Sequence, residues 1–287
     1  MRNSRTIRGC LAGLVLLALV AADSAGAAGP ASYRKRVAVC IGINNYAGFQ
    51  PLSCPVRDAT LMADVFEAYG FDRVILMTDG EARRERIVAQ LRGLAAEMGQ
   101  DDLFVFYFAG HGQTVRRDND GLMGYLLPAD SRRGHASDDG ISMEFITNLI
   151  REMPTRDCLL LMDACYSGYA VENRSTGTPE ANNGKQLIHI LTAGGQMDRA
   201  YEAKGHGLFT RHVLDFFRTA SSTAGVSTQA LAAYVTPRVK RDTAGWQAPR
   251  FARRGGGDIV IAMRDQPDTR LAYADTQSFR SSSSAGL

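Results

Sequence analysis

"FVFYFAGHGQ", residues 104–113, joins an uninterrupted apolar run to a histidine that stands between two glycines. An apolar run of this length is typical of a strand buried on both faces of a parallel sheet. Such a strand would place the imidazole of His111 at its carboxyl end, the edge where open sheets bind their ligands. A single histidine in such a place is more often structural than functional. The stretch therefore predicts a fold first, and a function only if another reactive side chain reaches the same edge.

Similar apolar runs recur along the chain and alternate with amphipathic segments. Strands are expected at 36–44, 73–79, 102–110, 158–164, 187–193 and 256–263. Helices are expected at 58–70, 81–99, 142–153, 207–220 and 228–241. In the first of these helices, Leu61, Val65 and Phe66 recur at helical spacing. The alternation predicts an α/β fold, a three-layer sandwich in which a mostly parallel sheet of about six strands carries helices on both faces.

The two ends of the chain differ from the rest in composition. Three arginines in the first eight residues precede an apolar run at 11–22, and small residues follow up to Ala27. This order is typical of a secretory signal, so we expect residues 1–27 to be a signal peptide and the protein to be periplasmic or secreted. After cleavage no stable membrane association is expected, although a retained anchor is the alternative. One folded domain is expected over 36–263, followed by a disordered tail at 264–287.

The charges give no sign of a polyanionic partner. The 33 basic and 30 acidic residues are spread along the 287-residue chain and leave a formal net charge of +3. A nucleic-acid-binding surface would need a basic cluster or stripe, which the sequence lacks. We therefore expect no nucleic-acid partner.

A second predicted strand also ends in a reactive side chain. In "LLLMDACYSG", residues 159–168, the apolar run ends and Cys165 follows after Asp163 and the small Ala164. If this strand is the neighbour of 102–110, His111 and Cys165 face one crevice. The imidazole would then take the thiol proton and later return it, while backbone N–H groups such as those of Gly112 and Cys165 hold an oxyanion. The pair predicts a catalytic His–Cys dyad that requires no cofactor for its chemistry.

The two motifs "FYFAGHGQ" and "LLMDACYSG", with the histidine about 50 positions before the cysteine, resemble those of the caspase-fold peptidases. Asp163, two positions before Cys165, resembles the metacaspase and paracaspase branch, which includes bacterial caspase-like proteins. "AVCIGINNY", "RDA", "GYLLPAD" and "HGLFTRHVLDFF" stand in the order found in that family. The resemblance covers nearly all of 36–263 and implies a caspase-like fold and cysteine endopeptidase activity.

The resemblance also implies a pocket for the substrate residue before the scissile bond, lined by Asp58 and Asp163. Two carboxylates there would select arginine or lysine, so protein or peptide substrates with basic residues are the expected partners. Asp58 could instead be the N-cap of the helix that it opens, and Asp163 could be a strand-end acid bonded to a backbone N–H. Arg57, beside Asp58, could neutralise it.

Calcium is implied by the same resemblance, because metacaspases often require it. Acids in roughly corresponding segments are Asp120, Asp138, Asp139 and Glu172. Carboxylate oxygens suit calcium, although acids in loops are usually only solvated. Zinc is not expected, since the remaining histidines show no ligand spacing with cysteines and are interpreted as surface or helix residues; they are His135, His189, His206 and His212.

The polar segment at 171–186 lies between two predicted core strands. It is rich in Gly, Asn, Ser and Thr, so it should be exposed. Its basic residues, Arg174 and Lys185, fit the pocket described above and are candidate sites of self-cleavage, as in caspase-like relatives. A surface loop that is never cut is the alternative.

Two other classes of protein remain open. A catalytically silent relative would keep this fold as an interaction module. A structural secreted domain would pair Cys165 with Cys158 or Cys54 in a disulfide. The first interpretation, a cysteine endopeptidase that acts as a monomer, accounts for both motifs at once.

Overall fold

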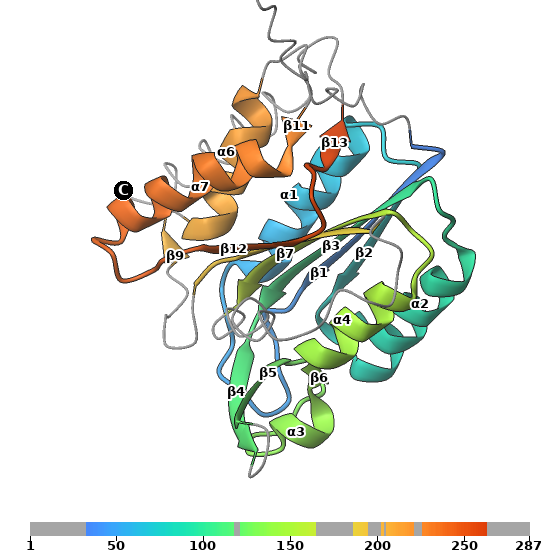
Figure 1. Cartoon of the computed structure of the whole chain (residues 1–287). Coiled ribbons are helices and arrows are strands. Elements are labelled where there is room, and N and C mark those ends of the chain that lie inside the picture. The colour runs from blue at the N-terminus through green and yellow to red at the C-terminus, as the bar shows by residue number, and fades with distance from the viewer. Residues whose placement is uncertain are drawn as a thin grey trace, which may run out of the picture.

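The computed structural model describes residues 33–117, 121–164, 186–194, 202–203, 205–220 and 226–262 (Figure 1). The expected signal peptide and tail lie outside these residues. So do Cys165, Asp120, Glu172, Arg174 and Lys185.

The centre of the fold is a six-stranded sheet in the order β12-β8-β7-β3-β1-β2. Neighbouring strands in it are parallel, except that β12 runs antiparallel to β8. This confirms the predicted α/β fold with a mostly parallel sheet. The strands are β1 (Lys35–Gly42), β2 (Arg73–Thr78), β3 (Asp102–Gly110), β7 (Asp157–Ala164), β8 (Leu187–Thr192) and β12 (Arg250–Arg254).

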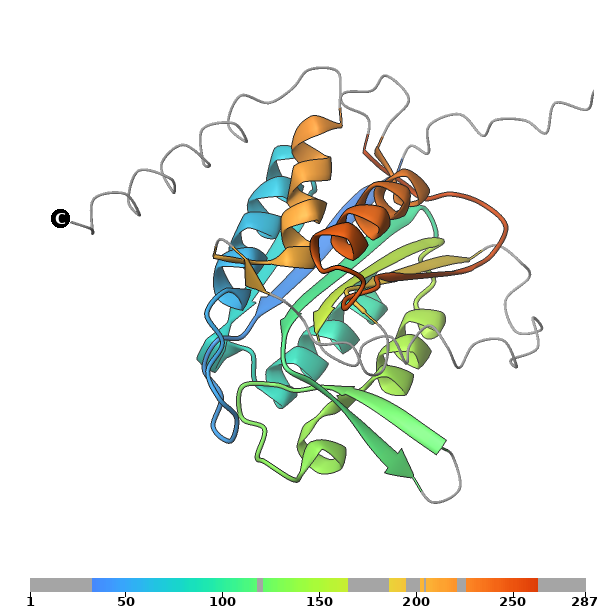
Figure 2. The same cartoon turned by 90° about the vertical axis from the view of Figure 1, so that its left-hand side faces the viewer.

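Helices cover both faces of the sheet, as the alternation predicted (Figures 1 and 2). One face carries α1 (Pro55–Ala68), α6 (Leu208–Thr219) and α7 (Thr228–Asp242). The other carries α2 (Arg84–Glu97) and α4 (Met143–Glu152). Two of these helices begin at a serine N-cap: Ser142 accepts a hydrogen bond from the Phe145 N–H, and Ser227 accepts one from the Ala230 N–H.

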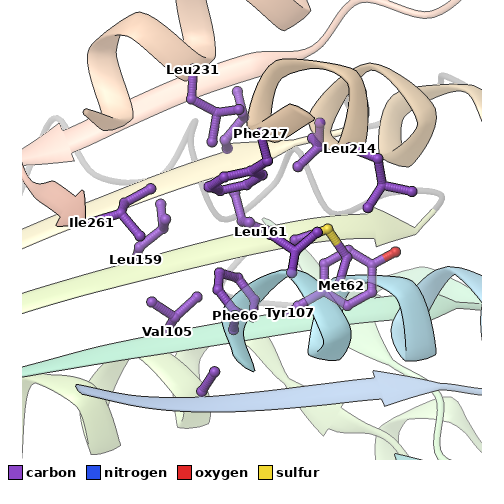
Figure 3. Close-up of a cluster of buried hydrophobic side chains, with 14 of the residues drawn as sticks. Met62, Phe66, Val105, Tyr107, Leu159, Leu161, Leu214, Phe217, Leu231 and Ile261 are labelled. Carbon is purple, nitrogen blue, oxygen red and sulfur yellow. The ribbon is translucent and has the colours of Figure 1, made fainter. Parts of the chain in front are cut away.

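The core is divided between the two faces by the alternation of side chains along each strand. In β3, Val105 and Tyr107 point toward α1 and α6, where Figure 3 shows them with Phe66 and Phe217. Phe104, Phe106 and Phe108 point toward α2 and α4. Each large apolar side chain buried in this way contributes about 1.5–3 kcal/mol relative to an exposed one. All nine residues of β3 are buried, which explains the unbroken apolar run.

Short strands outside the central sheet differ from the prediction. β4 (Gly112–Arg117), β5 (Gly121–Leu126) and β6 (Ile141–Ser142) form a separate sheet beside α3 (Ala136–Asp139). The strand expected at 256–263 is shortened to β13 (Val260–Ala262) and pairs with β11 (Val226–Ser227), whereas β12 takes the edge of the central sheet. β9 (Glu202–Ala203) and β10 (His206–Gly207) form a small hairpin. A 3-10 turn, η1 (Asp79–Glu81), follows β2.

Trp246 lies in the turn after α7 and is 72% exposed. The backbone N–H of Trp246 donates a hydrogen bond to the Thr243 carbonyl at 3.0 Å. This bond fixes the backbone of the turn, while the indole ring faces solvent. Among the described residues, no helix is both long and apolar enough to cross a membrane.

Candidate active site

The carboxyl ends of β3 and β7 lie next to each other in the central sheet (Figure 1). Their register pairs Gly110 with Ala164. The next residue in one chain segment is His111, and the next in the other is Cys165. The sequence required neighbouring strands for these residues to share a crevice, and the sheet order satisfies that requirement. Cys165 itself lies outside the described residues.

The imidazole of His111 is oriented by the segment that follows β1. Its Nε2 lies 2.8 Å from the carbonyl oxygen of Gln50. The rings of Tyr46 and Phe49 flank it, with centroids 4.8 and 5.7 Å from that of the imidazole. A carbonyl oxygen only accepts hydrogen bonds, so this contact places the proton on Nε2. In the neutral imidazole, Nδ1 is then the basic nitrogen. The sequence showed no group that orients His111; a backbone carbonyl leaves no mark in side-chain patterns.

Gly110 is required by the same segment. The Tyr46 hydroxyl accepts a hydrogen bond from the His111 N–H at 2.8 Å, and it lies where a side chain at Gly110 would stand. Burial raises the pKa of Tyr46 well above its usual range. The room that glycine leaves beside His111 is thus used by the protein's own tyrosine.

Asp79 fastens the segment that carries Tyr46 and Gln50. Its carboxylate accepts hydrogen bonds from the backbone N–H groups of Asn44 and Asn45, at 2.7 and 2.9 Å, and from the Asn45 side chain at 3.0 Å. Asp79 has a φ of 42°, in the left-handed region that aspartate adopts at a cost. Three hydrogen bonds from one short segment explain why the residue is held there.

Gly112, the expected oxyanion donor, begins β4 and is buried. It stands opposite Leu126 in β5, and the adjacent ladder bond runs from the Leu127 N–H to the His111 carbonyl at 3.0 Å. In an antiparallel pair, this pattern makes Gly112 and Leu126 a non-hydrogen-bonded pair. The Gly112 N–H therefore takes no part in the ladder between β4 and β5.

The two acids expected to line a substrate pocket are brought together, and both are buried. Asp58 is 1% exposed and accepts hydrogen bonds from His206 Nδ1 at 2.6 Å and from the Gly207 N–H at 2.8 Å. Asp163 is 6% exposed; its Oδ2 accepts bonds from the N–H and hydroxyl of Thr210 at 3.2 and 2.5 Å. A methyl group added at Gly207 would collide with the Asp163 carboxylate and stand 3.2 Å from Asp58 Oδ2. Both carboxylates thus border the same glycine.

Burial dominates the electrostatics of this cluster. It raises the pKa of Asp58, against the opposing effects of the His206 and Gly207 hydrogen bonds. It also raises the pKa of Tyr107 well above its usual range, and the nearby charges of Asp58 and Asp163 add to that shift. The Tyr107 hydroxyl lies 2.7 Å from Thr210 Oγ1, so β3 is connected to Asp163 through this threonine.

The alternative role of Asp58 as an N-cap is wrong. The helix begins three residues earlier, at Pro55, and Cys54 occupies the N-cap position. Proline is favoured in the first turn because its missing N–H is not needed there. Asp58 consequently lies on the buried side of the first turn.

The histidines outside the motif correct the sequence interpretation. His206 lies in β10 and bonds Asp58, and His189 is fully buried in β8 with its Nδ1 2.5 Å from Thr228 Oγ1. Neither is a surface or helix residue. His135 is exposed, and His212 lies in α6, as expected. His206, Thr210 and Tyr107 are the site residues to which the sequence assigned no role.

Of the four acids considered for calcium, the described ones are Asp138 and Asp139, both in α3. Arg132 donates its Nε and Nη2 to the two carboxylate oxygens of Asp139, each at 2.9 Å. These hydrogen bonds lower the pKa of Asp139 to about 2. Asp138 lies 3.5 Å from His135 Nδ1. Within the described residues, no group of three or more His, Cys, Asp and Glu side chains could hold a metal ion.

The disulfide between Cys165 and Cys158 is wrong. Cys158 is a free thiol near the start of β7, and burial raises its pKa well above the usual range. A strand advances about 3.3 Å per residue, so the far end of β7 is about 20 Å away. A disulfide requires Cα atoms within about 7 Å. Cys54, buried at the start of α1, stays a candidate partner that thiol titration can test.

Comparison with known proteins adds independent findings. A family model described as "Caspase domain" matches residues 35–255. Metacaspase-1 from Meyerozyma guilliermondii is 29% identical over 154 residues, which cover 48% of this chain and 36% of that protein. Metacaspase III c from Phaeodactylum tricornutum is 30% identical over 158 residues, covering 50% of this chain and 46% of that protein. The matches thus span less than half the length of these relatives.

Among solved structures, a protein from Geobacter sulfurreducens has a similar fold, with a TM-score of 0.61. The alignment covers 80% of this chain and 97% of that one, at 18% sequence identity. At this low sequence identity, the match shows only that the two proteins share an arrangement of helices and strands.

Proposed function

This chain belongs to the caspase domain family, and from that premise we propose that it is a cysteine endopeptidase that cleaves peptide bonds after arginine or lysine. One observation carries the proposal. The register of β3 and β7 pairs Gly110 with Ala164, so His111 and Cys165 are the next residues in two adjacent parallel strands.

The orientation of His111 supports its role as the base. With Nε2–H donated to the Gln50 carbonyl, Nδ1 can accept the proton of the Cys165 thiol. The thiolate sulfur then forms a bond to the substrate carbonyl carbon, and the electron pair of the C=O bond moves to oxygen. Backbone N–H groups at the strand ends, with Gly112 as the candidate, hold this oxyanion.

Collapse of the tetrahedral intermediate breaks the C–N bond. The proton on His111 Nδ1 passes to the leaving amine, and an acyl-thioester remains on Cys165. Water, deprotonated by the same nitrogen, attacks the thioester and releases the thiol. The protein supplies the base, the nucleophile and the oxyanion donors, so the chemistry requires no metal or cofactor.

The preference for basic residues rests on Asp58 and Asp163. Both are buried beside Gly207, where an arginine guanidinium could bond two carboxylates at once. A neutral side chain would itself offer the two carboxylates no counter-charge in this buried site.

The dyad is tested with Cys165→Ala and His111→Ala in a fluorogenic Arg-peptide assay, with His135→Ala as a control at an exposed histidine. We expect both active-site variants to lose cleavage and to keep the thermal stability of the wild type, while the control retains activity. Residual turnover in either variant comparable to wild type would contradict the dyad. A folded wild-type protein without turnover on any peptide would favour the silent interaction module.

Three further features belong to the same proposal. Self-cleavage after Arg174 or Lys185 should yield new termini in wild type that mass spectrometry does not find in Cys165→Ala. Calcium, at Asp120, Asp138, Asp139 and Glu172, would act outside the catalytic chemistry. Export by the segment at 1–27 would place a monomeric enzyme in the periplasm or outside the cell.

A further inference from the structure

Asp58, one of the two acids of the proposed pocket, has a side chain of the protein itself as its partner. His206 Nδ1 lies 2.6 Å from Asp58 Oδ1, and the Gly207 N–H donates to Oδ2 at 2.8 Å. The Asp58 side chain is 1% exposed and that of His206 is 13% exposed. The imidazole therefore lies on the solvent side of a carboxylate that is otherwise closed off.

A second buried acid lies beside this pair. Asp163 borders the same Gly207 from β7, and both acids are near enough to Tyr107 of β3 to raise its pKa further. Two carboxylates close together in a buried site repel each other unless a positive charge compensates them. Arg57, on the same turn of α1 as Asp58, donates instead to the Gly205 carbonyl at 3.4 Å. His206 is thus the basic side chain that contacts Asp58 directly.

We propose that His206 occupies, in the substrate-free protein, the place on Asp58 that the arginine or lysine side chain of a substrate takes. His206 is then a specificity-determining residue, because a substrate cation must replace it before binding. This inference rests on the proposed preference for basic residues and adds a competitor built into the pocket.

The geometry suits such an exchange. The imidazole contributes a single hydrogen bond to Asp58, whereas a guanidinium presents parallel N–H groups that can bond a carboxylate twice. His206 also belongs to the two-residue strand β10, which follows a turn at Gly205 with a φ of 80°. The contact between Gly207 and Asp58 can persist when the imidazole rotates away, since it comes from the backbone.

The experiment measures binding without cleavage. All proteins carry Cys165→Ala, and the probes are Nα-acetyl-arginine N-methylamide and its citrulline analogue, which has the same shape but no charge. His206→Asn keeps an N–H donor near the position of Nδ1 and removes the basic imidazole, whereas His206→Lys introduces a fixed positive charge. His135→Asn is the matched control, because His135 faces Asp138 on the surface.

We expect His206→Asn to bind the arginine probe about tenfold more tightly than wild type, because a neutral amide competes less well for Asp58 than the imidazole now held at 2.6 Å. His206→Lys should bind it more weakly than wild type. The citrulline probe should not distinguish the variants, and His135→Asn should match wild type. Equal or weaker binding of arginine by His206→Asn would overturn the inference and leave the proposed preference intact.

A second measurement covers the case in which His206→Asn fails to fold. In the otherwise unchanged protein, the NMR signals of the His206 imidazole should shift when the arginine probe is added, and should not shift with citrulline. Arginine binding without that shift would overturn the inference. If no variant binds arginine at all, the basic-residue pocket itself is refuted, and the role of His206 with it.

Discussion

Asp58 and Asp163 lie buried on either side of Gly207, whereas Asp138 and Asp139 lie in the short helix α3 near the surface. Burial raises the pKa of Asp58, while the Arg132 hydrogen bonds lower that of Asp139 to about 2. The residue type is the same in both regions, and the shift has opposite sign. The surroundings therefore decide the direction of the pKa shift, which burial raises at Asp58 and pairing with an arginine lowers at Asp139.

The largest expected effect comes from removing one charge of the proposed pocket. Asp163→Asn should reduce kcat/KM for an arginine substrate by about 2–5 kcal/mol in transition-state terms, since a buried cation loses its partner. Steady-state kinetics with arginine and citrulline peptides measures it, with Asp215→Asn on α6 as the control. An unchanged preference for arginine would mean that another acid selects the substrate.

A smaller effect is expected at Thr210, which bonds both Asp163 and Tyr107. Thr210 donates its hydroxyl hydrogen to Asp163, so the Tyr107 hydroxyl must be the donor in its 2.7 Å contact with Thr210. Thr210→Val leaves both partners buried without this hydroxyl and should lower the free energy of unfolding by about 1–3 kcal/mol. Urea unfolding measures the loss. Thr210→Ser should restore most of it; if serine is as unstable as valine, the methyl group is responsible.

The opposite pKa shifts predict opposite pH dependences of stability. The raised pKa of Asp58 means that its contribution to stability is fully present below the unfolded pKa, near 3.8, and is lost as pH rises through its folded pKa. The lowered pKa of Asp139 means that its contribution is present above about 3.8 and is lost as pH falls toward 2.

Unfolding in urea at a series of pH values, with Asp58→Asn and Asp139→Asn beside wild type, separates the two. The free energy of unfolding of Asp58→Asn, relative to that of wild type, should be higher at neutral pH than at pH 4. The free energy of unfolding of Asp139→Asn, relative to that of wild type, should be higher in strong acid than at neutral pH. The same pH trend in both variants would contradict the opposite pKa shifts that burial and the arginine pairing give to Asp58 and Asp139.

The smallest effect is expected at Arg132. This arginine is exposed, and exposed ion pairs contribute little to stability, so Arg132→Ala should shift the unfolding midpoint less than Thr210→Val does. The substitution also frees both carboxylate oxygens of Asp139. If Asp139 binds calcium, calorimetric titration should show tighter binding in Arg132→Ala than in wild type. Weaker binding would mean that Arg132 supports the site instead of competing for it.

The central strands and helices could be predicted because their signals are local. Continuous apolar runs marked β1, β3 and β7 within one or two residues, and helical spacing marked α2 and α4. β12 was missed since its sequence, "RFARR", has the charged and half-exposed pattern of an edge strand, which only its pairing with β8 makes visible. The separate sheet of β4 and β5 depends in the same way on partners that local sequence does not identify.

The residues of the candidate site show the same difference between local signals and contacts made by distant parts of the chain. His111 was proposed from its motif, and Asp58 and Asp163 from the family resemblance; the strand order shows that the ends of β3 and β7 are neighbours. His206 was interpreted as a surface or helix residue because its partner, Asp58, stands 148 positions earlier in the chain. Gln50 acts through its backbone carbonyl, which every residue possesses. Long-range side-chain pairs and backbone carbonyl contacts follow from the fold, and no pattern of residues in the sequence predicts them.

Trp246 is the single tryptophan of the chain, and its indole already faces water in the native protein. Its fluorescence emission should therefore be red-shifted before unfolding and should change little in wavelength when the core opens. A denaturation curve followed at that emission would report the turn after α7 and understate the cooperative loss of the sheet. Near-ultraviolet circular dichroism of buried tyrosines such as Tyr107, which is fully buried between β3 and the helices above it, would follow the core directly.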